Sequence, residues 1–279
     1  MKTKLVSIII ISILIASCKT RVAPKFMIDN DGILVEKFDS TNVDENKYNL
    51  DNEIYVTGTK LIYSYKHIGI DKQEYFIGKI GKPGKTTKEW EFIPIERKND
   101  STILNVAIIP LNGNAFKASI PDYNQTNFLY NFLNTGGQSI GKEITGVIEN
   151  KKNIWIHPPR FALFSILELN PFPYISFPTK NGKKWNWHLS IGDHWSNVRW
   201  KKWVGRIEND YIYEILERKK LKTKFGEIKC VVSRATANSQ LGKTFLTSYF
   251  NEKYGFLKLE YINIDGSQTI FELEKVIKN

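Results

Sequence analysis

The chain has 279 residues, of which 42% are hydrophobic and 13% aromatic, and its 40 Lys and Arg against 29 Asp and Glu give a formal charge of +11. This length allows one large domain or two closely packed ones, with a sizeable core. The basic residues are scattered, and no recognition-helix, zinc-finger or RNA-binding motif accompanies them, which argues against nucleic acid and leaves anionic lipid or cell-wall polymers as partners.

Residues 1–17 have the form of a secretory signal peptide. Two lysines within residues 1–4 precede the apolar run 5–16, which is too short for a membrane-spanning helix of about 20 residues. The run ends in Ile15-Ala16-Ser17-Cys18, which resembles the lipobox of bacterial lipoproteins. The resemblance implies that the signal is removed and that Cys18 becomes the lipid-bearing first residue. An ordinary secreted protein with a cysteine near its cleavage site is the alternative.

Two further expectations depend on the lipidation of Cys18. Lys19 stands where an Asp would be the usual inner-membrane retention signal, so the resemblance implies an outer-membrane anchor, with the protein facing the periplasm. Cys230 is then the one remaining thiol, and a single thiol cannot form an internal disulfide. Because Cys230 lies in an apolar, strand-like run, we expect it to be buried and structural.

The chain after the signal divides into a tether and two regions. Residues 18–25 are short and polar and form the tether. Residues 26–135 form an N-terminal β region that ends in a helix, and residues 136–279 form a C-terminal antiparallel β region. Since no linker separates the two regions, one continuous domain stays open as an alternative. The predicted class is mainly β, with curved antiparallel sheets or a half-barrel and one or two helices.

In the N-terminal region, β-branched and aromatic residues at 53–57 and 90–95 predict short strands. The segment 122–134 is predicted as a helix, because apolar residues at 128, 129, 132 and 133 share one helical face and Gly136-Gly137 would end it. A weaker helix is predicted at 160–169, where the sequence Asn170-Pro171 ends it, since the residue before a proline disfavours helix.

The C-terminal region shows the clearest strand pattern. Apolar residues alternate with charged ones at 257–261 and again at 271–273, which predicts strands with one buried face. Asp265-Gly266-Ser267 between them is typical of a hairpin turn. Strands joined by such short turns run antiparallel, so we expect a meander of five or six strands from about Trp200 to Ile277.

Gly137-Gln138-Ser139-Ile140-Gly141 matches the nucleophile-elbow motif of α/β-hydrolases, in which a strand-to-helix turn exposes the serine. The context is wrong for that fold, because a predicted helix precedes Ser139 and a predicted strand, Glu143–Ile148, follows it. We therefore favour a glycine-rich connector and assign no catalytic residue. A serine- or metal-dependent hydrolase stays an alternative function.

The segment Trp185–Trp195 has the densest cluster of unusual residues. As a strand it would place tryptophans on one face and His188 on the other. His188, Asp193 and His194 are weak metal-ligand candidates, but their spacing matches no recognised motif, so we expect neither metal nor cofactor. Five tryptophans, with Phe177 and other aromatics before them, predict either an aromatic core or a ligand-binding surface held by proline-stiffened loops. The candidate ligand residues are Trp185, Trp187, Trp195, Trp200 and Trp203.

The body of the chain resembles uncharacterised lipoproteins of Gram-negative bacteria with a curved antiparallel sheet, through Gly242–Ser248 and Tyr254–Leu259. By analogy with localisation-factor lipoproteins, such a sheet would hold a lipid-like ligand. We therefore expect a non-enzymatic envelope protein that binds a hydrophobic or glycan ligand. A structural or partner-binding envelope protein is the second alternative.

Overall fold

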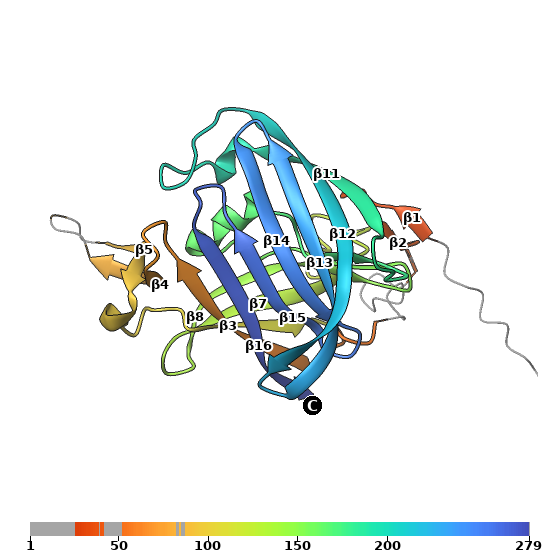
Figure 1. The fold of residues 1–279 in the computed structure, drawn as a ribbon, viewed down its shortest axis with the longest axis horizontal. Helices are drawn as coiled ribbons and strands as arrows, with labels where there is room; N and C mark the ends of the chain where they lie inside the picture. Colours follow the sequence, from red (N-terminus) through yellow and green to blue (C-terminus); the bar gives the residue numbers. More distant parts are fainter. Residues whose placement is uncertain (1–25, 39, 42–51, 82–83, 85–86, 279) are drawn as a thin grey trace, which may run out of the picture.

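The computed structural model describes residues 26–38, 40–41, 52–81, 84 and 87–278. Cys18 and the predicted tether therefore lie outside the described residues. Regular structure in the described part is mostly β-strand, arranged in one large antiparallel sheet and a separate two-stranded one (Figure 1). This confirms the predicted mainly β class with a curved antiparallel sheet. Among the described residues, no helix combines the length and the apolar character needed to cross a bilayer.

The strands of the first part are β1 (Phe26–Ile28), β2 (Leu34–Glu36), β3 (Thr59–Ile68), β4 (Glu74–Gly81), β5 (Lys88–Pro94), β6 (Asn105–Pro110), β7 (Thr126–Leu133) and β8 (Ser139–Glu149). Those of the second part are β9 (Asn153–Ile156), β10 (Tyr174–Ser176), β11 (Lys184–Gly192), β12 (Arg206–Thr223), β13 (Gly226–Ser239), β14 (Gly242–Asn251), β15 (Gly255–Ile262) and β16 (Gln268–Lys278). Three 3₁₀ segments accompany them: η2 (Ile95–Arg97), η3 (Ala162–Leu169) and η4 (Asp193–Trp195).

The large sheet has the order β10-β9-β8-β7-β6-β3-β16-β15-β14-β13-β12-β11, with β4 and β5 attached beside β3. Strand β3 pairs along its whole length with β16, the last strand of the chain. Strands β3, β6 and β7 of region 26–135 therefore lie in the middle of the sheet, between two groups of strands from region 136–279. Both regions share one sheet.

The predicted C-terminal meander is confirmed as five consecutive antiparallel strands, β12 to β16. The alternating residues Leu257, Leu259 and Tyr261 are buried, and so are Phe271 and Leu273. The predicted turn between β15 and β16 is closed by a hydrogen bond from the Asn263 backbone N–H to the Ser267 carbonyl. Gly266 has φ of +86° there, a conformation that glycine adopts without steric cost.

The predicted helix at 122–134 is wrong: this segment contains strand β7, which pairs with β6 on one side and β8 on the other. Its buried residues Phe128, Tyr130 and Phe132 follow a period of two, and strand pairing on both sides outweighs the helical pattern. The glycines at 136–137 form a hairpin turn rather than a helix end. The Asn134 side-chain oxygen accepts hydrogen bonds from the backbone N–H groups of Gly136 and Gln138 in that turn.

The other local predictions have mixed outcomes. The helix at 160–169 is present as the 3₁₀ segment η3, and the strand at 90–95 as β5. The strand predicted at 53–57 is wrong, because this segment forms bends and turns. The buried Glu149 carboxylate accepts the backbone N–H groups of Glu53, Ile54 and Tyr55, so these amides do not pair with a strand.

The sheet curves until its two edge strands, β10 and β11, come close through their side chains. The ring of Tyr174 in β10 lies 5.6 Å from that of Trp185 in β11. The hairpin of β1 and β2 contacts both sides of the seam at which these two edges of the large sheet meet. Its Asp31 carbonyl accepts a 2.6 Å hydrogen bond from the Trp187 indole, and its Leu34 carbonyl accepts the Asn150 side chain. The first described residues therefore close the curved sheet.

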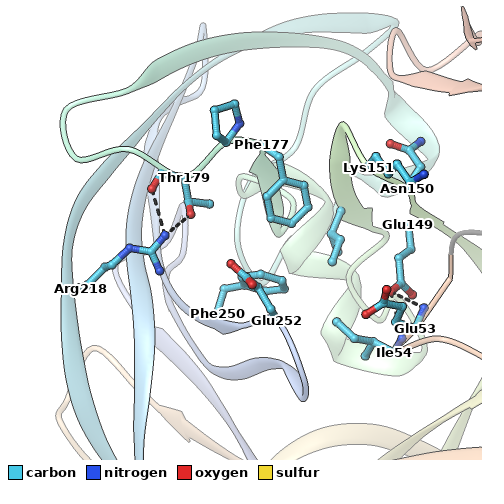
Figure 2. Close-up of a pocket in the computed structure, with 12 residues that line it drawn as sticks. Glu53, Ile54, Glu149, Asn150, Lys151, Phe177, Thr179, Arg218, Phe250 and Glu252 are labelled. Atoms are coloured by element: carbon cyan, nitrogen blue, oxygen red, sulfur yellow. Dashed lines mark hydrogen bonds between the residues drawn. The ribbon is translucent and has the colours of Figure 1, made fainter.

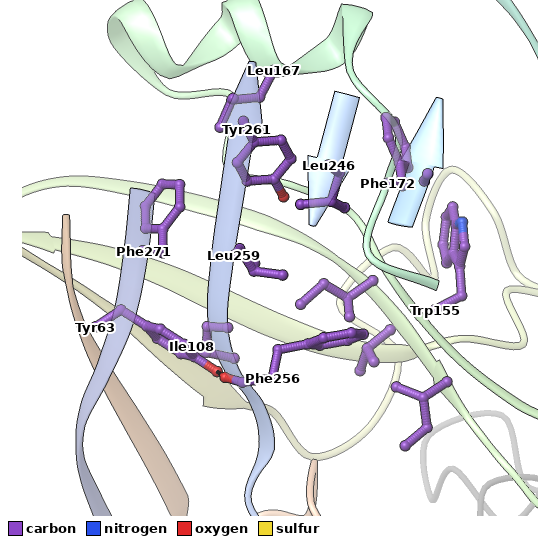
Figure 3. Packing of buried hydrophobic residues seen from close by; sticks show 14 of the residues in the cluster. Tyr63, Ile108, Trp155, Leu167, Phe172, Leu246, Phe256, Leu259, Tyr261 and Phe271 are labelled. Carbon is purple, nitrogen blue, oxygen red and sulfur yellow. Dashed lines mark hydrogen bonds between the residues drawn. The ribbon is translucent and has the colours of Figure 1, made fainter. Parts of the chain in front are cut away.

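The concave side of the sheet is filled by large side chains (Figure 3). Aromatic rings from opposite parts of the sheet meet there, such as Trp155 of β9 and Trp187 of β11, whose ring centres are 5.7 Å apart. Segment η3 contributes Phe164, which stacks on Phe132 of β7. An apolar cavity in this interior, partly lined by Tyr63 and Phe271, measures about 20 Å³, which is room for about one water molecule.

Candidate functional site

An open groove of about 770 Å³ is lined by residues from segments that are far apart in the chain (Figure 2). Five parts of the chain line it: the segment before β3, the end of β8 with the turn to β9 and the start of β9, the loop after β10, strand β12, and the end of β14 with the turn after it. Its lining residues are Glu53, Ile54, Glu149, Asn150, Lys151, Ile154, Phe177, Pro178, Thr179, Arg218, Phe250 and Glu252.

The floor of the groove is apolar and rigidly packed. Ile54, Ile154 and Phe250 are at most 4% exposed, so they belong to the core as well as to the groove. Phe177 is only half-buried, and its ring meets that of Phe250 edge-on, with centres 6.1 Å apart. The groove therefore presents one aromatic ring on an apolar base, held by contacts beneath it.

The rim of the groove is polar and carries both signs of charge. On one side the Arg218 guanidinium donates to the side-chain and backbone oxygens of Thr179. On the other side stand Asn150 and Lys151, and the exposed carboxylates of Glu53 and Glu252 complete the rim. Arginine presents five N–H donors in a fixed fork, so Arg218 keeps donors for a ligand beyond those that Thr179 uses.

Glu149 holds one wall of the groove in place. Its Oε1 atom accepts the backbone N–H groups of Glu53 and Ile54 at 2.8 and 2.9 Å, and its Oε2 atom accepts that of Tyr55 at 2.8 Å. Burial raises the pKa of Glu149, although these three hydrogen bonds oppose the rise. These three hydrogen bonds all come from backbone N–H groups, so the role of Glu149 is to support the wall of the groove. The carboxylate that this wall presents to a ligand is the exposed one of Glu53.

The five candidate tryptophans lie elsewhere in the fold. Trp187, Trp200 and Trp203 are buried at 6 to 9% exposure, and Trp185 and Trp195 are half-buried. Trp185 stacks on Tyr213 and Trp187 stacks on Tyr211, which makes both part of the aromatic packing between β11 and β12. None of the five lines the groove. A ligand-binding role for them stays a prediction.

The weak metal candidates do not converge. His188 contacts Asp210 at 2.8 Å and Glu208 at 2.6 Å on the exposed face of β11 and β12, and these carboxylates, Asp210 first, raise its pKa. Asp193 accepts the Gly205 backbone N–H, and the His194 ring packs on Trp195. Within the described ranges, no group of three or more suitable side chains could hold a metal ion.

Ser139 does not have the geometry of a nucleophile elbow. It is the first residue of β8, so no helix follows it. Its exposed hydroxyl donates a hydrogen bond to the side-chain oxygen of Asn131 in the neighbouring strand β7. This is a contact between paired strands and not a catalytic one. The prediction that Cys230 is buried is confirmed. Cys230 is 2% exposed, and burial raises the pKa of its thiol.

Sequence reasoning missed most of the groove, because its residues come from segments that are far apart in the chain. Phe177 was among the aromatics noted before the tryptophan cluster, and it follows the proline-rich stretch 171–173. A proline-stiffened loop that carries a half-buried ring is therefore a usable signal. Arg218, Glu53 and Glu252 carry no motif of their own.

These features define the class of protein: an antiparallel β protein with a filled interior and an open, polar-rimmed groove. A comparison with protein-family models finds no match, and a comparison with curated proteins finds none at a significant level.

Among solved structures, the chain is similar to a predicted exported protein with a YmcC-like fold from Bacteroides fragilis, at 11% identity over 81% of this chain and 98% of that one, with a TM-score of 0.46. A predicted lipoprotein from Parabacteroides distasonis gives 11% identity over 80% and 96%, with a TM-score of 0.45. The hypothetical lipoprotein YmcC from Escherichia coli K12 gives 8% over 81% and 90%, with a TM-score of 0.34. Likenesses this distant carry no information on function.

Proposed function

We propose that this protein is an outer-membrane lipoprotein, anchored at Cys18 and facing the periplasm, that binds a glycan in the open groove. The observation that carries the binding proposal is the half-buried Phe177 ring on an apolar floor, surrounded by a polar rim. A sugar ring offers a flat face of C–H groups and an edge of hydroxyls. Such a ligand matches an aromatic platform with hydrogen-bonding groups around it.

The interior of the sheet favours a glycan over the alternative hydrophobic ligand. A lipid carrier needs an apolar space that accommodates acyl chains. Here the concave side is packed with rings, and the apolar cavity in it measures about 20 Å³. The groove, by contrast, has charged and amide groups along its rim. A chain of sugars satisfies these groups, whereas an acyl chain would leave them without partners.

Support for the anchor comes from the sequence alone. A signal-like segment ends in Ile15-Ala16-Ser17-Cys18, and Phe26, where the described fold begins, follows after seven intervening residues. One acyl chain gives marginal membrane binding, with K on the order of 10⁴ M⁻¹, and a lipoprotein cysteine carries several. The anchor would therefore hold the chain firmly.

The anchor is tested by the change Cys18→Ser in cells grown with labelled palmitate. We expect the label to be lost and the protein to leave the membrane fraction, because no thiol remains at the processing site. The matched control is Cys230→Ala, which removes the other cysteine and should leave both the label and the membrane association unchanged. Label retained in the Cys18→Ser variant would contradict the proposal.

The groove is tested by the change Phe177→Ala in the mature chain carrying Cys18→Ser. The probes are muropeptides from digested peptidoglycan and deacylated lipopolysaccharide oligosaccharides, with binding followed by native mass spectrometry. Removal of an aromatic ring on which a nucleic-acid base stacks costs about 1–3 kcal/mol, and for a stacked sugar we likewise expect binding to weaken about fivefold or more.

The matched control for this test is Phe116→Ala. Phe116 is also half-buried and also meets a single aromatic ring, that of Tyr123, but it lies outside the groove. Equal weakening in both variants, or no binding of either probe to the unaltered groove, would contradict glycan binding there. The latter result would favour a partner-binding envelope protein instead.

A further inference from the structure

Lysines gather at the turn between β12 and β13, the longest hairpin of the sheet, which lies at the bottom of Figure 1 near the C-terminus. We call Lys220, Lys222, Lys224 and Lys229 the basic tip. All four side chains are exposed. Lys220 and Lys229 face each other directly across the two strands. Like charges placed opposite each other in a sheet destabilise it, so the fold itself gains nothing from this pair.

The carboxylates nearby offset only part of this charge. Glu227 pairs with Lys220 at 2.6 Å, and Glu274 lies 3.7 Å from Lys224. Lys222 and Lys229 have no carboxylate partner within the part of the chain that the structure describes. The basic tip therefore presents uncompensated positive charge to the outside, which is suited to an anionic partner.

Aromatic side chains accompany the basic tip. The Phe225 ring, at the turn itself, stacks on the Tyr254 ring with centres 5.4 Å apart. The ammonium group of Lys253 lies 5.1 Å from the centre of the Tyr254 ring. Both rings are half-buried. Lysines with aromatic rings among them are typical of surfaces that rest on a lipid headgroup layer, where the rings reach the apolar boundary and the lysines meet phosphates.

The groove lies between the basic tip and the start of the described fold. Arg218, in the same strand as the basic tip, forms one rim of the groove, and Asn150 forms the opposite rim. Asn150 binds the Leu34 carbonyl of β2, and β2 pairs with Phe26, where the fold begins. Eight residue steps from Cys18 to Phe26 span at most about 28 Å, so an anchor at Cys18 would hold Phe26, and with it the β1–β2 hairpin that contacts Asn150, near the bilayer.

We propose that the basic tip docks on anionic, phosphate-bearing headgroups of the membrane that carries the anchor, with the groove opening beside that surface. This proposal rests on the proposed membrane anchorage. Its test uses a chain without the lipid, so that a failure of the basic tip and a failure of the anchor give different results. The groove would then meet glycans that are presented close to the membrane.

The experiment measures sedimentation of the mature chain with Cys18→Ser on vesicles of phosphatidylcholine, with and without phosphatidylglycerol. We expect binding only to the vesicles with phosphatidylglycerol, and loss of that binding in high salt. The variant Lys222→Gln/Lys224→Gln/Lys229→Gln should bind at least about tenfold more weakly, because each lysine near an anionic surface contributes about fivefold. The same three positions changed to Arg should retain binding, because the charge is kept.

The matched control is Lys201→Gln/Lys202→Gln/Lys243→Gln. It removes the same charge from exposed lysines near the opposite ends of β12 and β14. Binding that falls equally in both triple variants would show a general charge effect and overturn the proposal. Binding to neither kind of vesicle would overturn it too, as would retention on isolated peptidoglycan sacculi without binding to vesicles.

Discussion

Glu168 is a carboxyl group in the apolar segment η3, 6% exposed, and one of its oxygens has no hydrogen-bond partner within the described residues. Burial raises its pKa from 4.5 to about 7, and the nearby Arg160 opposes the rise. Arg160 itself forms a 2.8 Å ion pair with Glu143. A group whose pKa is higher in the folded state binds more protons folded than unfolded. Its contribution therefore lowers stability as pH rises from about 4.5 to about 7.

The change Glu168→Gln keeps the shape of the side chain and removes the charge. We expect it to raise the free energy of unfolding at about pH 8, by up to about 3 kcal/mol, and to change it little at about pH 5, where the carboxyl is already protonated in the folded protein. Urea unfolding at the two pH values measures this difference. Glu143→Gln should instead destabilise at about pH 8, because it breaks the ion pair with Arg160. Equal effects of Glu168→Gln at both pH values would contradict a buried, ionisable Glu168.

At the scale of strands and turns, the sequence predicted elements well where a single pattern was present. The alternation in 257–261 matched β15, and the proline after Asn170 marked the end of η3. The segment 122–134 carried two patterns at once, because residues 128 and 132 fit both a helical face and a strand face. Pairing with β6 and β8 decided between them, and no local feature of the sequence contains that information.

The groove was harder to predict for the same physical reason. Its wall at 53–55 has a composition typical of a strand, but its amides bind the Glu149 carboxylate, which is nearly a hundred residues away in the chain. Its aromatic platform was visible as Phe177, while the tryptophans that dominate the sequence pattern went largely into packing. A dense aromatic cluster indicates where a core lies, and a single ring on a proline-stiffened loop is the better sign of a surface.

At the scale of the whole molecule, the order of the strands makes the two predicted regions dependent on each other. Strands β3, β6 and β7 of region 26–135 separate β8 from β16, which both belong to region 136–279. Without the first region, the second would expose an unpaired edge on β8 and another on β16. Exposed edges of this kind favour aggregation, and the hydrophobic face above them would lose its cover.

We therefore expect a chain of residues 18–279 to unfold in a single cooperative transition, although its length exceeds that of most two-state domains. Trp90 is the one tryptophan in region 26–135, so in a Trp90→Phe variant the fluorescence reports on region 136–279 alone, while far-UV circular dichroism reports on both. The two signals should give the same melting midpoint, and the calorimetric and van't Hoff enthalpies should agree. Residues 136–279 expressed alone should lack a cooperative melt. Separate midpoints, or a folded fragment 136–279, would show instead that each region has a core of its own and that the shared sheet joins two independently stable halves.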